Sequence, residues 1–112
     1  INGAYTAAST YSTTSAPSNP YSMFLVMSYD SNYADAGTAT VRHNLKTGNQ
    51  IPADILAEVD RKIDDGNARL GTFRFSAFSA SGVAPTEASC HEAGAWKVTG
   101  TIEPYCGGAS LF

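Results

Sequence analysis

Residues 51–66 constrain this chain most, because only there do the apolar spacing, a helix start signal and a helix stop signal all agree. Apolar side chains recur there at the three-and-four spacing of one helical face, and charged side chains fall on the opposite face. The apolar set is Ile55, Leu56, Val59 and Ile63, and the charged set is Asp54, Glu58, Arg61 and Lys62. Pro52 suits the first turn of a helix, and Gly66 suits the left-handed residue that ends one. The sequence therefore predicts an amphipathic helix over residues 52–64 that covers a flat apolar surface.

The end of this helix is unusually acidic. Asp60, Asp64 and Asp65 lie in its C-terminal half, where the helix dipole disfavours each anion by roughly 0.3 to 1 kcal/mol. Asp60 and Asp64 also form a like-charge pair four residues apart. We therefore expect other groups to hold these carboxylates. The candidates are amides of the following loop, the side chains of Arg69 or Arg74, or a bound cation, for which carboxylate oxygens are suitable ligands.

The remaining apolar segments predict antiparallel β-strands. Strands are expected over residues 21–29, 38–45, 72–78 and 95–102. The first of these is a continuous apolar run rich in β-forming residues. The second alternates, which predicts that Val41 and His43 share its apolar face. In the last, Trp96 and Val98 are expected to point inward, and the final residues Leu111 and Phe112 to tuck under the sheet.

The composition fits one small folded domain. The chain has 112 residues, of which 43% are hydrophobic and 15% are charged, so it is neither disordered nor large enough for two cores. We expect a single domain over residues 1–112 of the α+β class, with an antiparallel sheet and one amphipathic helix. The formal charge of −3 offers no basic face for nucleic acid or anionic membranes.

Cys90 and Cys106 are the two cysteines, and they lie 16 positions apart. They could be free thiols, metal ligands or one disulfide. Zinc would require four ligands, and only His43 and His91 remain as partners. A disulfide is favoured, since the intervening segment suits a bridged loop, and it would contribute on the order of 3 kcal/mol. Such a bond indicates an oxidising, extracytoplasmic compartment.

No motif for catalysis stands out. Neither histidine lies in a nucleophile motif, and the sequence lacks a phosphate-binding glycine loop and a metal signature. The loop residues Asp30, Asn32 and Asp35 carry oxygens, but without the central glycine and distal glutamate of a calcium loop. We therefore expect no enzyme activity, no cofactor and no metal. Tyr5, Tyr11 and Tyr33 lie in polar loops and are the tyrosines expected at an interface.

Part of the chain resembles a known family. The segment from Asp60 through Lys62, Asp64, Asp65 and Gly66 to Gly71 is similar to a motif in the soluble domains of bacterial type IV pilins and pseudopilins. Cys90, Trp96 and Cys106 follow in the order seen in those proteins. The resemblance covers about half of the chain, residues 50–112.

This resemblance implies the globular head of a structural subunit in an extracellular pilus or a periplasmic pseudopilus. Its partners would be other pilin subunits. Type IV pilins also carry a long hydrophobic helix, which anchors them in the membrane and forms the filament core. The printed sequence contains no such helix, so we expect it either to have been removed or to lie on a separate short chain, as in split pilins. The surfaces expected to contact neighbouring heads are residues 1–20, 30–37 and 79–110.

A secreted binding module is the alternative. In that interpretation a small disulfide-stabilised domain holds a carbohydrate or a protein through its tyrosine-rich loops. An exposed strip of Phe, Val and Leu would favour the pilin interpretation, and a missing apolar partner face would favour the binding module.

Overall fold

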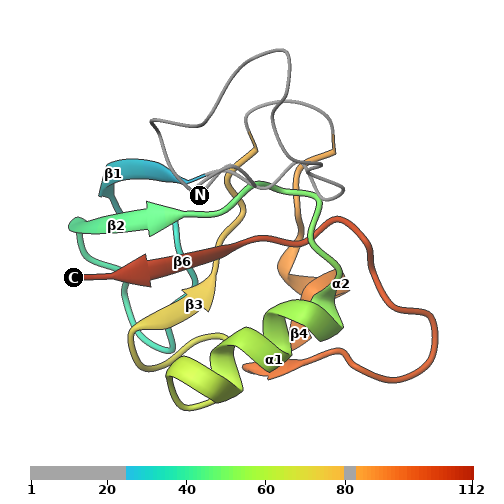
Figure 1. Ribbon diagram of the computed structural model, residues 1–112. Coiled ribbons are helices and arrows are strands. Elements are labelled where there is room, and N and C mark those ends of the chain that lie inside the picture. Colours follow the sequence, from blue (N-terminus) through green and yellow to red (C-terminus); the bar gives the residue numbers. More distant parts are fainter. Residues whose placement is uncertain (1–24, 80–82) are drawn as a thin grey trace, which may run out of the picture.

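The computed structural model describes residues 25–79 and 83–112 and has an α+β fold (Figure 1). Four strands form an antiparallel sheet in the order β1-β2-β6-β3. The strands are β1 Val26–Asp30, β2 Arg42–Lys46, β3 Phe73–Phe75 and β6 Gly108–Leu111. Helix α1, Ala53–Ile63, packs beside β3, and a short helix α2, Glu87–Cys90, leads into a hairpin of β4, His91–Glu92, and β5, Ala95–Trp96. The expected α+β class with an antiparallel sheet and one amphipathic helix is confirmed.

Helix α1 has nearly the expected bounds, but it presents a different face to the core. Leu56 and Asp60 are buried, whereas Val59 and Ile63 are 37% and 61% exposed. The prediction that Val59 and Ile63 share the buried face with Leu56 was therefore wrong. The reason is Asp60, whose Oδ2 accepts a hydrogen bond from the indole N–H of Trp96 at 2.8 Å. That bond turns the face of Leu56 and Asp60 inward.

The fourth strand of the sheet is not the one expected. Residues 95–102 contribute only β5, which pairs with β4 outside the main sheet, and Val98 is exposed. The fourth strand is β6, from the small residues near the end of the sequence. A Cβ on Gly108 would lie 2.4 Å from the ring of Phe73, so the absence of a side chain lets β3 pack there. Leu111 is buried as expected, but Phe112 is 60% exposed.

The two faces of the sheet are covered differently. The strand register places Met27, Leu45, Ser110 and Phe73 in one row across one face, because directly paired residues point to the same side. At the β3 end of this row, Phe73 packs into the main core with Leu56 of α1. At the β1 end, Met27 is 63% exposed. Helix α1 therefore covers only part of this face.

The opposite face is covered by the segment between β1 and β2. Tyr33 and Ala39 of this segment pack on Ala109 and Leu111 of β6. The Tyr33 hydroxyl donates to the carbonyl of Thr40. The prediction that Tyr33 is a surface contact residue was wrong, because Tyr33 is only 6% exposed. The other two tyrosines predicted at an interface, Tyr5 and Tyr11, lie outside the described residues.

The predicted faces of β2 are also reversed. Val41 and His43 are exposed, whereas Asn44 and Lys46 are fully buried. Lys46 can be buried because its Nζ donates to Asp30 Oδ1 and to Asn44 Oδ1, both at 2.6 Å. A buried ammonium with charged and polar partners avoids the cost of an unpaired charge. Polar side chains thus take the covered face, and the apolar ones remain in solvent.

Candidate interaction surface

The motif residues form a tight turn between α1 and β3. Asp64 Oδ2 accepts hydrogen bonds from the backbone N–H groups of Thr72 and Phe73 at 2.6 and 2.8 Å. Asp65 Oδ1 accepts from the N–H of Asn67 at 2.9 Å. Of the explanations considered for the acidic helix end, bonding to loop amides is therefore confirmed for both carboxylates. Gly71 is required in this turn, because it has φ +74° and a Cβ there would lie 2.1 Å from Asp64 Oδ2.

The arginines play another role than the one considered. Arg74 forms an ion pair with Asp35, and Arg69 donates to the carbonyl of Asp35 at 2.6 Å. The expectation that either arginine pairs with Asp64 or Asp65 is not met. The N–H of Gly37 and the Arg74 guanidinium together hold the pKa of Asp35 below its usual value, although burial opposes them. These contacts tie the segment after β1 to β3.

Asp60 links the motif to the hairpin. Its carboxylate accepts from Trp96 Nε1 and from the N–H of Gly66, the latter at 3.0 Å. Burial raises the pKa of Asp60, and the nearby charges of Asp64 and Asp65 add to this, while the two hydrogen bonds act in the opposite direction. Carboxylate oxygens of the three aspartates lie within 4.8 Å of one another. The N–H donors named above already bind one or both carboxylate oxygens of each aspartate. Hydrogen bonds within the chain therefore explain why the three carboxylates lie close together.

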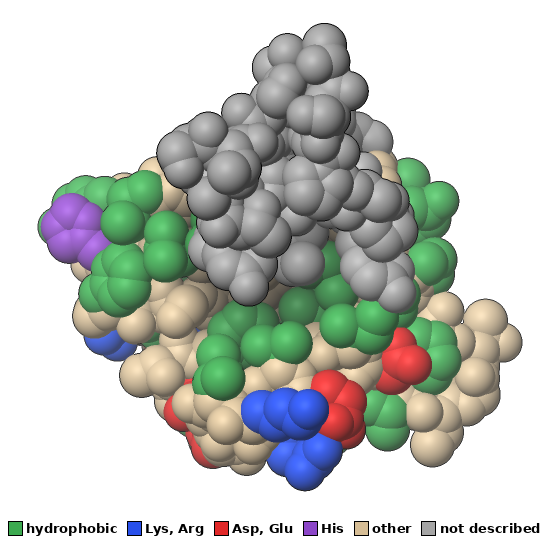
Figure 2. Space-filling view, viewed as in Figure 1, with side chains coloured by type: hydrophobic (Ala, Val, Ile, Leu, Met, Phe, Trp, Pro, Cys, Tyr) green, Lys and Arg blue, Asp and Glu red, His purple; other side chains and the backbone are tan. Residues whose placement is uncertain are grey.

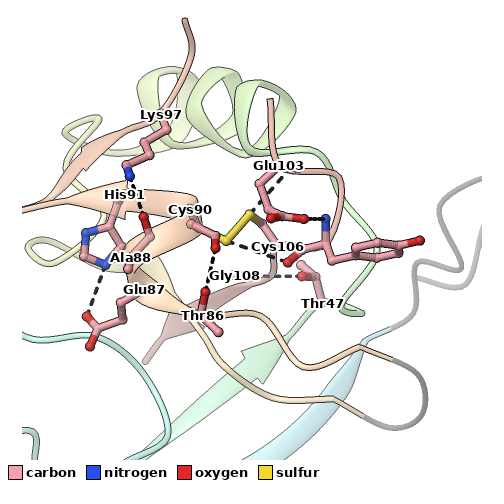
Figure 3. The surroundings of a disulfide bond; sticks show 12 residues. Thr47, Thr86, Glu87, Ala88, Cys90, His91, Lys97, Glu103, Cys106 and Gly108 are labelled. Atoms are coloured by element: carbon pink, nitrogen blue, oxygen red, sulfur yellow. Dashed lines mark hydrogen bonds and ion pairs between the residues drawn. A yellow bond between two sulfur atoms is a disulfide. The ribbon is translucent and has the colours of Figure 1, made fainter. Parts of the chain in front are cut away.

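The disulfide belongs to the main hydrophobic core, and Figure 3 shows its surroundings. The predicted bond between Cys90 and Cys106 is present, with both residues fully buried. It joins the end of α2 to the segment that leads into β6, and the Ile51 backbone pairs with Cys106 on its other side. Within this segment, Glu103 Oε1 accepts from the N–H of Tyr105 at 3.1 Å. The disulfide and the backbone pairing of Ile51 with Cys106 together connect three segments of the chain.

His91 follows the disulfide directly and is buried. Its Nδ1 accepts from the N–H of Gly94 at 3.1 Å, and its Nε2 lies 3.1 Å from Glu87 Oε1. The ring packs edge-on against Phe75 and Trp96. Burial lowers the pKa of His91, although the Glu87 carboxylate acts in the opposite direction. His91 is therefore a neutral core residue near pH 7.

The loop considered for calcium is held by the chain's own donors. Asp30 binds Lys46, and the N–H of Asn32 donates to Asp30 Oδ1 at 3.1 Å. Burial alone would raise the pKa of Asp30, but its bonds to Lys46, Asn32 and Asn44 outweigh this and lower it. The alternation of residues 38–45 gave no sign of this buried cluster, because it predicted Val41 and His43 on the covered face and did not include Lys46.

Several apolar residues and one histidine gather on the end of the sheet that no other described segment covers, which we call the open face. Its members are the exposed residues Leu25, Met27, Tyr29, Val41, His43 and Phe112 and the half-buried Leu45. Met27 pairs with Leu45 and Tyr29 with His43, whose rings lie 4.6 Å apart. Figure 2 shows hydrophobic side chains grouped around a histidine on this side of the molecule. The sequence missed this surface because its side chains were expected in the core.

A second, smaller apolar surface lies along the outer side of α1. A shallow groove of about 440 Å³ is lined there by Ile55, Val59 and Val98, with Asp54, Glu58 and Lys62 as its charged residues.

In residues 25–79 and 83–112, no helix has both the length and the apolar character needed to cross a bilayer. Comparisons of the chain with protein-family models, with curated proteins and with solved structures returned no match.

Proposed function

We propose that this chain is the globular head of a subunit in a type IV pilus or pseudopilus-like filament, and that the open face binds the hydrophobic helix of that subunit. The helix would belong either to an adjoining segment or to a separate chain. The open face carries this proposal. Its exposed Leu25, Val41 and Phe112 favour the pilin interpretation, and α1 already packs on the other end of the same face of the sheet.

The dimensions of the open face suit a helix. Adjacent strands lie about 4.8 Å apart, and a helix with its side chains is about 10 Å wide. A helix lying on β1 and β2 would therefore contact Met27 and Leu45 beneath it and reach the small Ser110 on β6. Side chains of this size release roughly 1.5 to 3 kcal/mol each when fully buried. A few such contacts are sufficient to bind a helix, because the apolar side chains of the helix are also removed from water.

The motif turn supports this role by keeping the sheet rigid. Asp64 fixes the start of β3 through two amides, and Asp60 fixes the hairpin through Trp96. None of these groups is presented to a substrate, so in this proposal they hold the structure of the head. The disulfide agrees with an oxidising compartment outside the cytoplasm. The other partners would be further pilin subunits, and contact with the membrane would occur only through the helix.

Immunogold electron microscopy of the producing cells, with an antibody against this domain, tests the proposal. Gold spaced along thin filaments is the expected result for a major subunit, and gold at filament tips or bases for a minor one. Gold scattered on cells or in the medium without filaments would overturn the proposal. That outcome would favour the secreted binding module.

A variant tests the open face directly. Met27→Lys with Tyr29→Glu places two charges on this face without adding net charge, and both side chains are more than 60% exposed. We expect cells producing this variant to make a stable protein but no labelled filaments. A matched control changes Ile63 and Val98, which are similarly exposed on the α1 side, to Lys and Glu. Loss of filaments in the control alone would contradict the assignment of the helix to the open face.

A further inference from the structure

The two edges of the main sheet differ in how their backbone groups are used. At the β3 edge, the N–H of Phe75 donates to the carbonyl of Ala68, and the carbonyl of Phe75 accepts from the N–H of Ala34. That edge is therefore closed by the chain itself. At the other edge, β1 pairs only with β2, and among the described residues no further backbone hydrogen bond involves Val26–Asp30.

The sequence of β1 contains none of the features that usually prevent an edge strand from pairing. Natural edges are protected by lysine, proline, bulges or an inward charge. Strand β1 reads Val-Met-Ser-Tyr-Asp and has no proline, glycine or lysine. Its one charge, on Asp30, is bound by Lys46 of the same chain at 2.6 Å. Within residues 25–79 and 83–112, this edge is thus unpaired and nearly neutral.

We propose that two copies of this chain pair through their β1 edges, antiparallel and centred on Ser28, to form one continuous eight-stranded sheet. In this register Met27 of each copy lies opposite Tyr29 of the other, which gives two symmetric contacts between a thioether and a ring. Val26 lies opposite Asp30. The two Asp30 carboxylates are then about 13 Å apart along the strands, beyond the screening length of about 8 Å in physiological salt.

A second copy fits this edge because β1 is self-complementary about Ser28, whereas an unrelated strand would have to supply that pattern. The pairing uses the edge and leaves the open face uncovered, and it joins the open faces of the two copies side by side. It does not rest on the proposed function. Filament labelling tests the proposed function, and the association state of the purified chain tests the pairing of the β1 edges.

Sedimentation velocity of four proteins tests the pairing and its register. The wild type, Met27→Lys with Tyr29→Lys, Met27→Lys with Tyr29→Glu, and the α1-side control Ile63→Lys with Val98→Glu are compared over a range of concentrations. The double lysine variant places like charges opposite each other, and the lysine and glutamate variant places opposite charges there. Both destroy the apolar character of the open face equally.

We expect the wild type, the lysine and glutamate variant and the control to sediment as dimers, and the double lysine variant to associate at least about tenfold more weakly. A wild type that stays monomeric at every concentration overturns the proposal. So does a double lysine variant that dimerises as well as the lysine and glutamate variant, since the association would then not use this register.

A second measurement does not depend on charges at positions 27 and 29. Ser28→Cys places two thiols directly opposite each other across the symmetry axis, at a Cα separation of about 4.5 to 5.5 Å that a disulfide can span. We expect this variant to cross-link into covalent dimers under mild oxidation, while Thr99→Cys, at an exposed position away from β1, does not. Equal cross-linking of the two variants overturns the proposal.

Discussion

The motif region and the open face place their polar and apolar groups in opposite ways. Around the motif, the buried Asp60 carboxylate binds the indole of Trp96, and the half-buried Asp64 carboxylate binds the start of β3. On the open face, Met27 and Tyr29 are exposed and no other described segment covers them, while Lys46 of the neighbouring strand is buried. One region satisfies its groups internally, and the other leaves apolar surface for something else to cover.

This difference separates stability from binding. Changes in the motif region or the disulfide should lower the free energy of unfolding, because they leave buried groups without partners or free the unfolded chain. Changes on the open face should leave folding nearly intact and act on association. The following experiments test this separation, beginning with the largest expected effect on stability.

Removal of the disulfide should have the largest effect. Changing Cys90 and Cys106 to Ser should lower the free energy of unfolding by about 3 kcal/mol, since the bond closes a loop of 16 residues and restricts the unfolded chain. Urea unfolding followed by Trp96 fluorescence measures this. The wild type in reducing buffer should match the variant. A loss below about 1 kcal/mol would mean that the core holds this region without the bond.

Gly71 and Gly100 form a matched pair. Both have positive φ, +74° and +71°, but a Cβ on Gly71 meets Asp64 whereas one on Gly100 meets nothing within 4 Å. Gly100→Ala should cost about 1 kcal/mol from backbone strain alone. Gly71→Ala should cost about 2 to 3 kcal/mol, because the Asp64 carboxylate must also leave its two amides. Equal losses in urea unfolding would show that the motif turn has no special role.

His91 predicts a loss of stability in mild acid. Because burial lowers its pKa in the folded state below the ordinary value of 6.5, the unfolded chain takes up the proton first. Stability is therefore complete above about pH 6.5 and falls as the pH drops toward the folded pKa, with a slope of up to about 1.4 kcal/mol per pH unit. Thermal unfolding between pH 8 and pH 5 measures it.

The control for this prediction is His91→Asn, whose amide oxygen can still accept from Gly94 but does not titrate. Asp60, with its raised pKa, acts in the opposite sense as the pH falls, but it is present in both proteins. The difference in stability between wild type and variant therefore isolates the contribution of His91. Identical pH profiles for the two proteins would contradict the assignment. The neighbouring charges on Glu87, Arg69 and Lys97 are the same in both.

The open face should give the smallest change in stability. Changing Met27 and Tyr29 to Ala should alter the free energy of unfolding by less than about 0.5 kcal/mol for each residue, as is usual for exposed positions. The same variant should bind an apolar helix and a hydrophobic dye less well than the wild type. A large loss of stability in urea unfolding would show that these side chains already have partners within the chain.

Local signals in the sequence were enough to predict the elements that depend on neighbouring residues. Apolar spacing, Pro52 and Gly66 gave the helix, whose observed range Ala53–Ile63 differs from the predicted 52–64 by one residue at each end. The cysteine spacing favoured the disulfide that is present. The α+β class followed from one helical period among several strand-like runs. The acidic residues after the helix indicated held carboxylates, which the loop amides provide.

The tertiary structure alone decided which face of each element lies inside. Burial of Asp60 depends on Trp96, 36 positions away, and burial of Lys46 depends on Asp30 across the sheet. A periodic pattern shows that a strand has two faces, but partners distant in the sequence determine which face is covered. The small residues of β6 gave no strand signal, because their role is to admit the Phe73 ring. Residue order therefore determined the helix and the cross-link, while long-range pairing determined the core and the open face.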